Sequence, residues 1–265
     1  MYAAPVLALK YLRYYLGGSN GRGHGIHSPF VFEFVTKVLN DQQAYPAYAT
    51  VESLRSVLKK DERVLPVLDL GAGSGKKTSG ERKVADIARH AAKPKKLGQL
   101  LYRMVQYYQP SSIIELGTSL GITTAYLAKA HTNGSLTTIE GSPVIAETAA
   151  ANFRNLGLDK IQLVTGNFDD RLPEILATVP SVDFAFVDGN HRQEPTYRYF
   201  LQLLEKVKPD SILVFDDIHW SREMEAAWQQ IREHPAVRCT IDLFFIGIVL
   251  FRQEFHEKQH FTIRY

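Results

Sequence analysis

The chain has 265 residues, of which 45% are hydrophobic and 22% are charged, an ordinary composition for a globular protein. The formal net charge of +3 argues against a protein that binds nucleic acid through overall basic charge. The single cysteine, Cys239, excludes an internal disulfide and fits a reducing compartment.

No segment approaches the roughly 18 consecutive apolar residues that span a bilayer. The longest apolar run, residues 243–251, is about half that length and contains Gly247. The N-terminus has no basic region ahead of its apolar stretch, so the sequence does not predict a signal peptide. We therefore expect a cytoplasmic protein without a membrane partner.

The N-terminal part of the chain predicts helices and loops. An aromatic helix is expected within residues 1–20, ending at the Gly17-Gly18 pair, and a glycine-rich loop follows it. Ser28 followed by Pro29 is a helix start signal, and the apolar segment FVFEFVTKVL after it predicts a buried helix.

Another helix is expected over residues 49–60. We interpret residues 1–96 as a helical extension, or lid, and residues 97–265 as the core of the protein.

The segment VLDLGAGSG, residues 67–75, resembles a nucleotide-binding loop, but its surroundings argue against that role. Such a loop needs an apolar helix directly after it and then a strand that ends in an acid. Here polar residues follow, and the next periodic segments, residues 82–91 and 97–108, predict helices with no acid-ended strand after them. We interpret residues 67–75 as a turn or an active-site flap.

Residues 76–96 carry eight lysines and arginines against Glu81 and Asp86. The simpler interpretation is a solvated helix face, and the alternative is a patch for an anionic substrate or RNA. RNA sites usually place stacking aromatic residues among the basic ones, and this segment has no aromatic residue. Nucleic acid is therefore disfavoured as a partner, although this alternative stays open.

Residues 111–140 carry the strongest functional signal. They predict a buried strand, a loop with Gly117 and Gly121, a helix, and a second strand that ends at Glu140. An acid about 20 residues past such a loop can reach ribose hydroxyls. The loop reads ELGTSLG and lacks the glycines that a pyrophosphate requires. The segment therefore predicts a site for an adenine-nucleoside cofactor, and its loop weakens the case for a dinucleotide.

From residue 111 onward, apolar strands alternate with helices, which predicts an α/β fold with a doubly wound, mostly parallel sheet. After the last helix, residues 237–243 and 246–252 leave little room for a crossover and predict an antiparallel hairpin. The strands are expected at residues 113–116, 135–139, 161–164, 184–187 and 211–215, with helices at 121–130, 143–156, 172–178 and 195–207.

A seven-stranded sheet closed by a C-terminal hairpin resembles the Rossmann-like fold of class I S-adenosylmethionine-dependent methyltransferases. The segments IIELGTSLGITTAYLA, TTIEGSP, VDFAFVDGNH and ILVFDDIHW look like successive motifs of these proteins. The last two resemble the catechol-type and bacterial O-methyltransferases. The resemblance covers roughly residues 100–252.

The loop residues fit the methionine end of this cofactor. Gly117 and Gly121 allow close approach of the backbone, and Thr118 and Ser119 offer donors for a carboxylate at a helix start. The resemblance implies that Glu115 lies near the sulfonium.

The remaining cofactor contacts follow the next two strands. Glu140 is expected to bind the ribose hydroxyls, with Gly141 and Ser142 beside the adenine. The resemblance places Asn167 and Phe168 at the adenine edge. Asp169 or Asp170 takes the polar role if that loop is shifted.

Three acids are expected to converge on the methyl side of the cofactor, because Asp188, Asp216 and Asp217 all end strands. In the catechol-type enzymes, the resemblance implies, the matching Asp, Asp and Asn hold a divalent cation such as Mg²⁺ or Ca²⁺. This sequence departs from that pattern, since Asp217 stands where Asn is expected. A third carboxylate can still bind the metal, so Asp188, Asp216 and Asp217 are the candidate metal ligands. Without a metal, Asp217 becomes a candidate general base.

Two histidines follow the same strand ends. His191 stands where the bacterial enzymes often carry Lys, and His219 lies after the last parallel strand. Either imidazole is a candidate general base, since its charge changes near neutral pH. The alternative is a hydrogen-bonded loop histidine in each case.

The function expected from these features is S-adenosylmethionine-dependent O-methylation of a small molecule, with or without a divalent cation. RNA or protein methylation on the same fold is one alternative, and an NAD-dependent oxidoreductase or a non-catalytic cofactor-binding protein is another. The aromatic N-terminus and the apolar hairpin offer surfaces for a homodimer.

Overall fold

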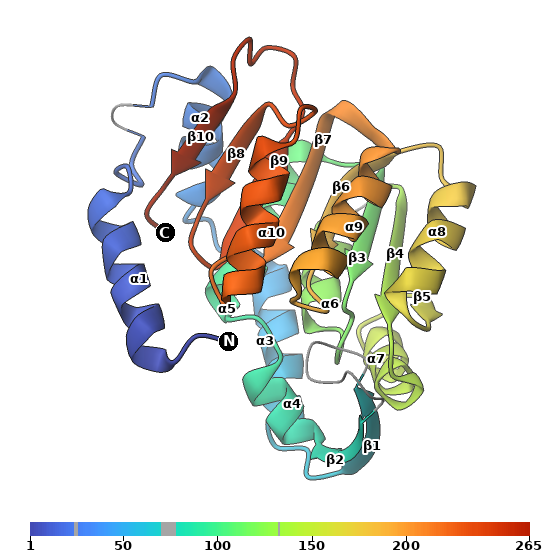
Figure 1. The fold of residues 1–265 in the computed structure, drawn as a ribbon. Coiled ribbons are helices and arrows are strands. Elements are labelled where there is room, and N and C mark those ends of the chain that lie inside the picture. The colour runs from blue at the N-terminus through green and yellow to red at the C-terminus, as the bar shows by residue number, and fades with distance from the viewer. Residues whose placement is uncertain (24–25, 70–77, 132) are drawn as a thin grey trace. The chain divides into compact units, whose positions relative to one another are not determined.

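A computed structural model describes residues 1–23, 26–69, 78–131 and 133–265. By its internal contacts the chain divides into two units, of which one comprises Met1–Asp41 and Leu176–Tyr265 and the other Gln42–Ile175. Each unit contains parallel strands with helices beside them (Figure 1).

The second unit is built on three parallel strands in the order β3 (Ser112–Leu116), β4 (Ser135–Glu140) and β5 (Ile161–Thr165). Helix α6 (Ile122–Ala130) connects β3 to β4, and α7 (Pro143–Asn155) connects β4 to β5 (Figure 1). All of β3 is buried, as expected for a strand covered on both faces. The loops that follow these strands therefore share one edge of the sheet.

Three more helices of this unit are α3 (Pro46–Leu58), α4 (Val84–His90) and α5 (Lys95–Tyr108), and both α3 and α5 contact α6. The apolar residues of α5 recur every three or four positions, which gives the helix one buried face. That face includes Leu97, Leu100, Leu101, Met104 and Val105.

Strand β2 corrects one expectation. The helix predicted over residues 82–91 begins only at Val84, because Thr78–Lys83 forms β2 and pairs antiparallel with β1 (Val64–Asp69). The polar side chains of β2 gave no strand signal, since a two-stranded sheet does not require alternating apolar residues. The glycines of VLDLGAGSG lie outside the described residues.

Acidic side chains neutralise part of the positive charge of residues 76–96. Lys83 forms an ion pair with Glu62 at 2.8 Å, and Arg89 forms one with Asp86 at 3.1 Å. All four side chains are exposed, so these pairs contribute little to stability. They do reduce the positive charge available to an anionic partner.

The first unit begins its sheet with β6 (Val182–Val187), which pairs in parallel with β7 (Val207–Asp216). Strand β9 (Ile246–Leu250) is antiparallel to both β7 and β8 (Cys239–Asp242). These pairings confirm the predicted α/β fold with a C-terminal antiparallel hairpin. The predicted strand count omitted β10 (Gln259–Thr262), a short edge strand parallel to β8.

Helices α9 (Gln193–Leu204) and α10 (Arg222–Glu233) of the first unit pack against each other (Figure 1). The predicted N-terminal helix is α1 (Ala4–Gly17), capped by Gly18 as expected. The Ser28 hydroxyl accepts a hydrogen bond from the Val31 amide at 3.3 Å and caps the next helix.

The segment after Ser28 is one α-helical turn and a wider helix. Pro29–Glu33 is α-helical (α2), whereas Phe34–Leu39 is a π-helix (η1). Phe34, Val35 and Val38 are fully or almost fully buried, so the predicted burial of this segment is confirmed.

None of the helices in the described part of the chain has the length and apolar character that crossing a membrane requires.

Candidate active site

The loop between β3 and α6 adopts a backbone conformation that its glycines permit. Gly117 and Gly121 have φ angles of +103° and +81°, and Ser119 has +49°. The amides of Gly117 and Thr118 both donate to the Ile139 carbonyl, at 3.0 and 3.1 Å, so the loop is fixed to β4. Positive φ at alternate positions turns successive backbone donors to one side of a loop.

Glu140 joins this loop to the one after β4. Its Oε2 accepts a hydrogen bond from the Ser119 amide at 2.8 Å, and its Oε1 accepts one from the Ser142 amide at 2.9 Å. The side chain is half-buried. These two hydrogen bonds orient the carboxylate. Because a carboxylate oxygen can accept more than one hydrogen bond, the group is still suited to bind hydroxyls.

Glu115 lies below the loop and is fully buried. Its Oε2 accepts hydrogen bonds from Thr124 at 2.5 Å and from Thr138 at 2.6 Å. The hydroxyls of Thr118 and Thr138 lie 2.6 Å apart. The structure therefore places Glu115 in a hydroxyl network that supports the loop, and its contact with the sulfonium stays a prediction.

The residues predicted at the adenine edge follow β5. Asn167 is exposed, and its side-chain oxygen accepts from the Asp169 amide at 3.2 Å. Helix α8 (Phe168–Thr178) begins directly after it, so Asn167 caps this helix and Phe168 is its first residue. Their contacts with adenine stay predictions, as do those of Gly141 and the buried Ser142.

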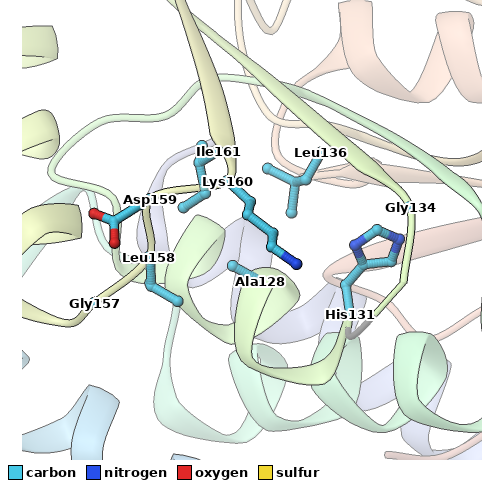
Figure 2. Close-up of a pocket in the computed structure, with 9 residues that line it drawn as sticks. All are labelled: Ala128, His131, Gly134, Leu136, Gly157, Leu158, Asp159, Lys160 and Ile161. Atoms are coloured by element: carbon cyan, nitrogen blue, oxygen red, sulfur yellow. The ribbon is translucent and has the colours of Figure 1, made fainter.

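A cavity of about 320 Å³ in the second unit lies away from these loops (Figure 2). Leu136 and Ile161 line it at the beginnings of β4 and β5, whereas Glu140 ends β4. His131, which also lines the cavity, lies 3.0 Å from the Pro110 carbonyl, and burial lowers its pKa. The cavity is therefore not the predicted cofactor site.

The first unit gathers acids and a histidine at the ends of β6 and β7. Asp188, His191 and Asp216 each present an atom able to bind a metal, and these atoms all lie within 4.8 Å of one another. Asp216 is 1% exposed, and the other two are half-buried. The His191 Nε2 atom lies 3.6 Å from an Asp188 oxygen.

Asp217 does not belong to this group of three. Its φ angle is +56°, its amide donates to the Phe245 carbonyl at 2.6 Å, and its carboxylate lies 3.9 Å from His191 Nδ1. Asn190 and His191 also have positive φ, +64° and +38°, which turns His191 back toward Asp188. The Gly-Asn pair before His191 is a turn signal that indicates such a return.

His219 occupies a different environment from His191. Its Nε2 lies 2.7 Å from Asp242 and its Nδ1 lies 3.1 Å from Glu225. Burial acts to lower the pKa of His219, but the two carboxylates outweigh it, and the pKa is raised. An imidazole whose nitrogens both face carboxylates is suited to hold a charge, which makes His219 a weaker candidate base than His191.

Trp220 follows His219, and its ring centroid lies 5.4 Å from that of His191. The indole therefore contacts the group that contains Asp188 and Asp216. The sequence analysis did not identify Glu225 or Asp242, which come from α10 and β8.

Residues 114–218 match a family model described as a methyltransferase domain. This part of the chain is similar to methyltransferase domains. Over 124 residues the chain is 32% identical to the catechol O-methyltransferase of Niastella koreensis, an alignment that covers 46% of this chain and 55% of the relative. The chain thus spans about half the length of this curated relative.

Solved structures show the same fold. The O-methyltransferase from Bacillus cereus in complex with SAH has a TM-score of 0.56 at 20% identity, covering 83% of this chain and 97% of that one. The O-methyltransferase TomG from Streptomyces achromogenes, in complex with SAM, has a TM-score of 0.56 at 19% identity, covering 84% and 95%. The predicted resemblance to class I methyltransferases of the catechol-type and bacterial O-methyltransferase group is confirmed.

Proposed function

We propose that this protein is an S-adenosylmethionine-dependent methyltransferase that methylates an oxygen of a small molecule. The observation that carries the proposal is the Glu140 carboxylate, held by the amides of Ser119 and Ser142 within the methyltransferase domain. The O-methyltransferase names of the relative and of the similar structures support an oxygen as the acceptor atom.

The proposal assigns the cofactor to the loops of the second unit. Glu140 binds the ribose hydroxyls, and the Ser119 hydroxyl is the donor for the methionine carboxylate near the start of α6. The predicted role of Thr118 is replaced by support of the loop, because its amide donates to Ile139 and its hydroxyl bonds to Thr138. Gly117 and Gly121 keep the backbone close to the ligand, and Glu115 contributes negative charge for the sulfonium. The adenine contacts are assigned to Gly141, Ser142, Asn167 and Phe168.

The acceptor is assigned to the residues around His191. In the transfer, an O–CH₃ bond forms as the S–CH₃ bond of the sulfonium breaks, and the cofactor leaves as a neutral thioether. The acceptor hydroxyl loses its proton to His191. Such a reaction depends mainly on in-line positioning and on removal of this proton.

Asp188 and Asp216 also suit a divalent cation, and His191 supplies a third ligand atom in the observed geometry. A bound cation would lower the pKa of the acceptor hydroxyl. Mg²⁺ and Ca²⁺ prefer oxygen ligands, so an imidazole in the set favours Mn²⁺ or a softer metal over them. If His191 binds the cation, Asp217 is the remaining candidate base.

A homodimer belongs to the same proposal. Helix α1 exposes apolar side chains along its outer face, with Leu9 at 50%, Leu12 at 51% and Leu16 at 69% exposure. Monomers rarely expose a contiguous apolar patch of this kind, and a second copy of the chain would cover it.

Sedimentation should give a dimer mass, and Leu12→Glu should give the monomer. A monomeric wild-type protein would exclude this part of the proposal.

Calorimetry tests the proposed cofactor directly. We expect binding of S-adenosylhomocysteine and no binding of NAD⁺, followed by methylation of protocatechuate, a catechol probe, in the presence of S-adenosylmethionine. Binding of NAD⁺ without S-adenosylhomocysteine would replace the proposal with the oxidoreductase alternative.

A further inference from the structure

The carboxylate of Glu225 connects three segments of the first unit. It accepts a hydrogen bond from the Tyr2 hydroxyl at 2.6 Å, and it forms an ion pair with Lys10 of α1 at 2.8 Å. Its Oε1 also lies 3.1 Å from His219 Nδ1. Residues ahead of α1, within α1, and after β7 thus meet at one side chain of α10.

His219 extends this cluster to the C-terminal hairpin. Its Nε2 contacts Asp242 at 2.7 Å, and its ring stacks on Phe244 with centroids 5.2 Å apart. Tyr11 of α1 packs edge-on against the same phenylalanine at 5.0 Å. We use the name α1 clasp for Tyr2, Lys10, His219, Glu225 and Asp242.

The clasp holds the loop that carries Trp220. The Tyr2 amide donates to the Trp220 carbonyl at 2.9 Å, so the chain before α1 is bonded to the residue whose ring contacts His191. His219 is fixed on one side of Trp220, and Ser221 begins α10 on the other, with its hydroxyl accepting from the Met224 amide. The position of the indole therefore depends on contacts made by α1.

The partners of Glu225 are not loosely placed surface groups. The side chains of Lys10 and Glu225 are 29% and 27% exposed, and the Lys10 ammonium also lies 4.5 Å from the Tyr2 ring centroid. Partial burial strengthens a charge pair relative to an exposed one. By contrast, Arg13 lies on the exposed side of the same helix.

We propose that α1 supports the part of this protein that binds the acceptor and that Glu225 is a positioning residue. Glu225 connects α1 to the loop 217–221 and so holds Trp220 against His191. Glu225 itself contacts neither cofactor nor acceptor. The expected effect of Glu225 on the reaction rate rests on the proposed function. The position of Trp220 can be measured without any catalysis.

The test uses the whole chain with Glu225→Gln, Lys10→Met and Glu225→Asp. The matched control is Arg13→Met, which removes an exposed positive charge of α1 that lies outside the clasp. Iodide quenching reports on Trp220, because the other tryptophan, Trp228, is 3% exposed. We expect greater quenching in Glu225→Gln and Lys10→Met, wild-type quenching in Arg13→Met, and partial recovery in Glu225→Asp.

Kinetics with protocatechuate give the second measurement. Glu225→Gln should lower kcat/KM at least about tenfold, chiefly through KM, while the Kd for S-adenosylhomocysteine stays within about twofold of wild type. Wild-type quenching and kinetics in both Glu225→Gln and Lys10→Met would overturn the inference. If the wild-type protein does not bind S-adenosylhomocysteine, the proposed function fails, and quenching alone decides whether the clasp exists.

Discussion

Glu140 has a structural role and, in the proposed function, a second role in binding the cofactor. Its two oxygens are held by backbone amides from different loops, so the carboxylate needs little reorganisation to receive hydroxyl groups. A carboxylate fixed in this way is a better ribose ligand than one on a mobile side chain.

Replacing Glu140 with Ala should weaken binding of S-adenosylhomocysteine at least about tenfold, which corresponds to about 1.4 kcal/mol. Both the hydroxyl ligand and the tie between the two loops are lost. Calorimetry gives the affinity, and Glu147→Ala on the exposed face of α7 is the matched control. An unchanged affinity in Glu140→Ala would show that the ribose assignment is wrong.

Replacing Asp188 distinguishes two forms of the proton-transfer step, one with a bound cation and one in which His191 acts without a metal. Asp188→Asn keeps the shape of the side chain but removes a charge from the group with His191 and Asp216. We expect loss of methyl transfer and weaker binding of Mn²⁺, measured by titration calorimetry, if a cation takes part. Intact turnover that chelators do not affect, with no Mn²⁺ binding by the wild type, would leave His191 as a base without metal.

At the scale of elements, the α6 start depends on Gly121. Its φ angle is +81°, and a Cβ atom there would lie 2.5 Å from the Phe153 ring on α7. Gly121→Ala is therefore expected to lower the free energy of unfolding by about 1–3 kcal/mol, through backbone strain and a clash.

A control separates strain from clash. Gly157 also has a positive φ, +64°, but a Cβ atom there meets nothing within 4 Å. Urea unfolding of Gly157→Ala should give the smaller loss, from strain alone. Equal losses in the two variants would show that the Phe153 contact does not matter.

The sequence predicted the elements whose signals are local. Strands β3 and β6 consist mostly of buried apolar residues, as does the second half of β7, and Ser28-Pro29 is a local helix start signal. Strand β2 was not predicted, because its residues are polar and its pairing with β1 leaves no periodic pattern of apolar residues in the sequence. Strand β10 was missed because four residues at a sheet edge have too little pattern to detect.

The site shows the same limit. The strand-end acids Asp188 and Asp216 could be predicted to lie together, because parallel strands end at one edge of a sheet. The two carboxylates around His219 could not, since Asp242 and Glu225 reach it from a hairpin strand and a helix. Contacts between distant segments depend on how the segments pack, and the periodic pattern of residues in one sequence does not show this.

At the scale of the whole molecule, stability should depend on pH through partly buried histidines. Burial lowers the pKa values of His131 and His234, both half-buried, below the ordinary value of 6.5. For such groups the unfolded chain binds protons more readily. Their contribution to stability is therefore complete above about pH 6.5 and is lost as the pH falls toward the pKa of the folded state.

His131→Leu isolates this effect. The free energy of unfolding of wild type relative to His131→Leu should decrease as the pH falls from 7.5 to about 5, measured by urea titration at each pH. His90→Leu, at an exposed position of α4, is the control. A difference between wild type and His131→Leu that does not change with pH would contradict the assignment.

Under the proposed function, the double attachment of Glu140 also limits how this protein can change its cofactor. In dinucleotide-binding folds, the acid about 20 residues after the glycine loop is one of the groups that select the ribose substituent. Here the same carboxylate is a structural tie between the turns at Ser119 and Ser142. A substitution that alters ribose selectivity would also release both turns, so a new cofactor preference requires compensating changes in two loops rather than one residue.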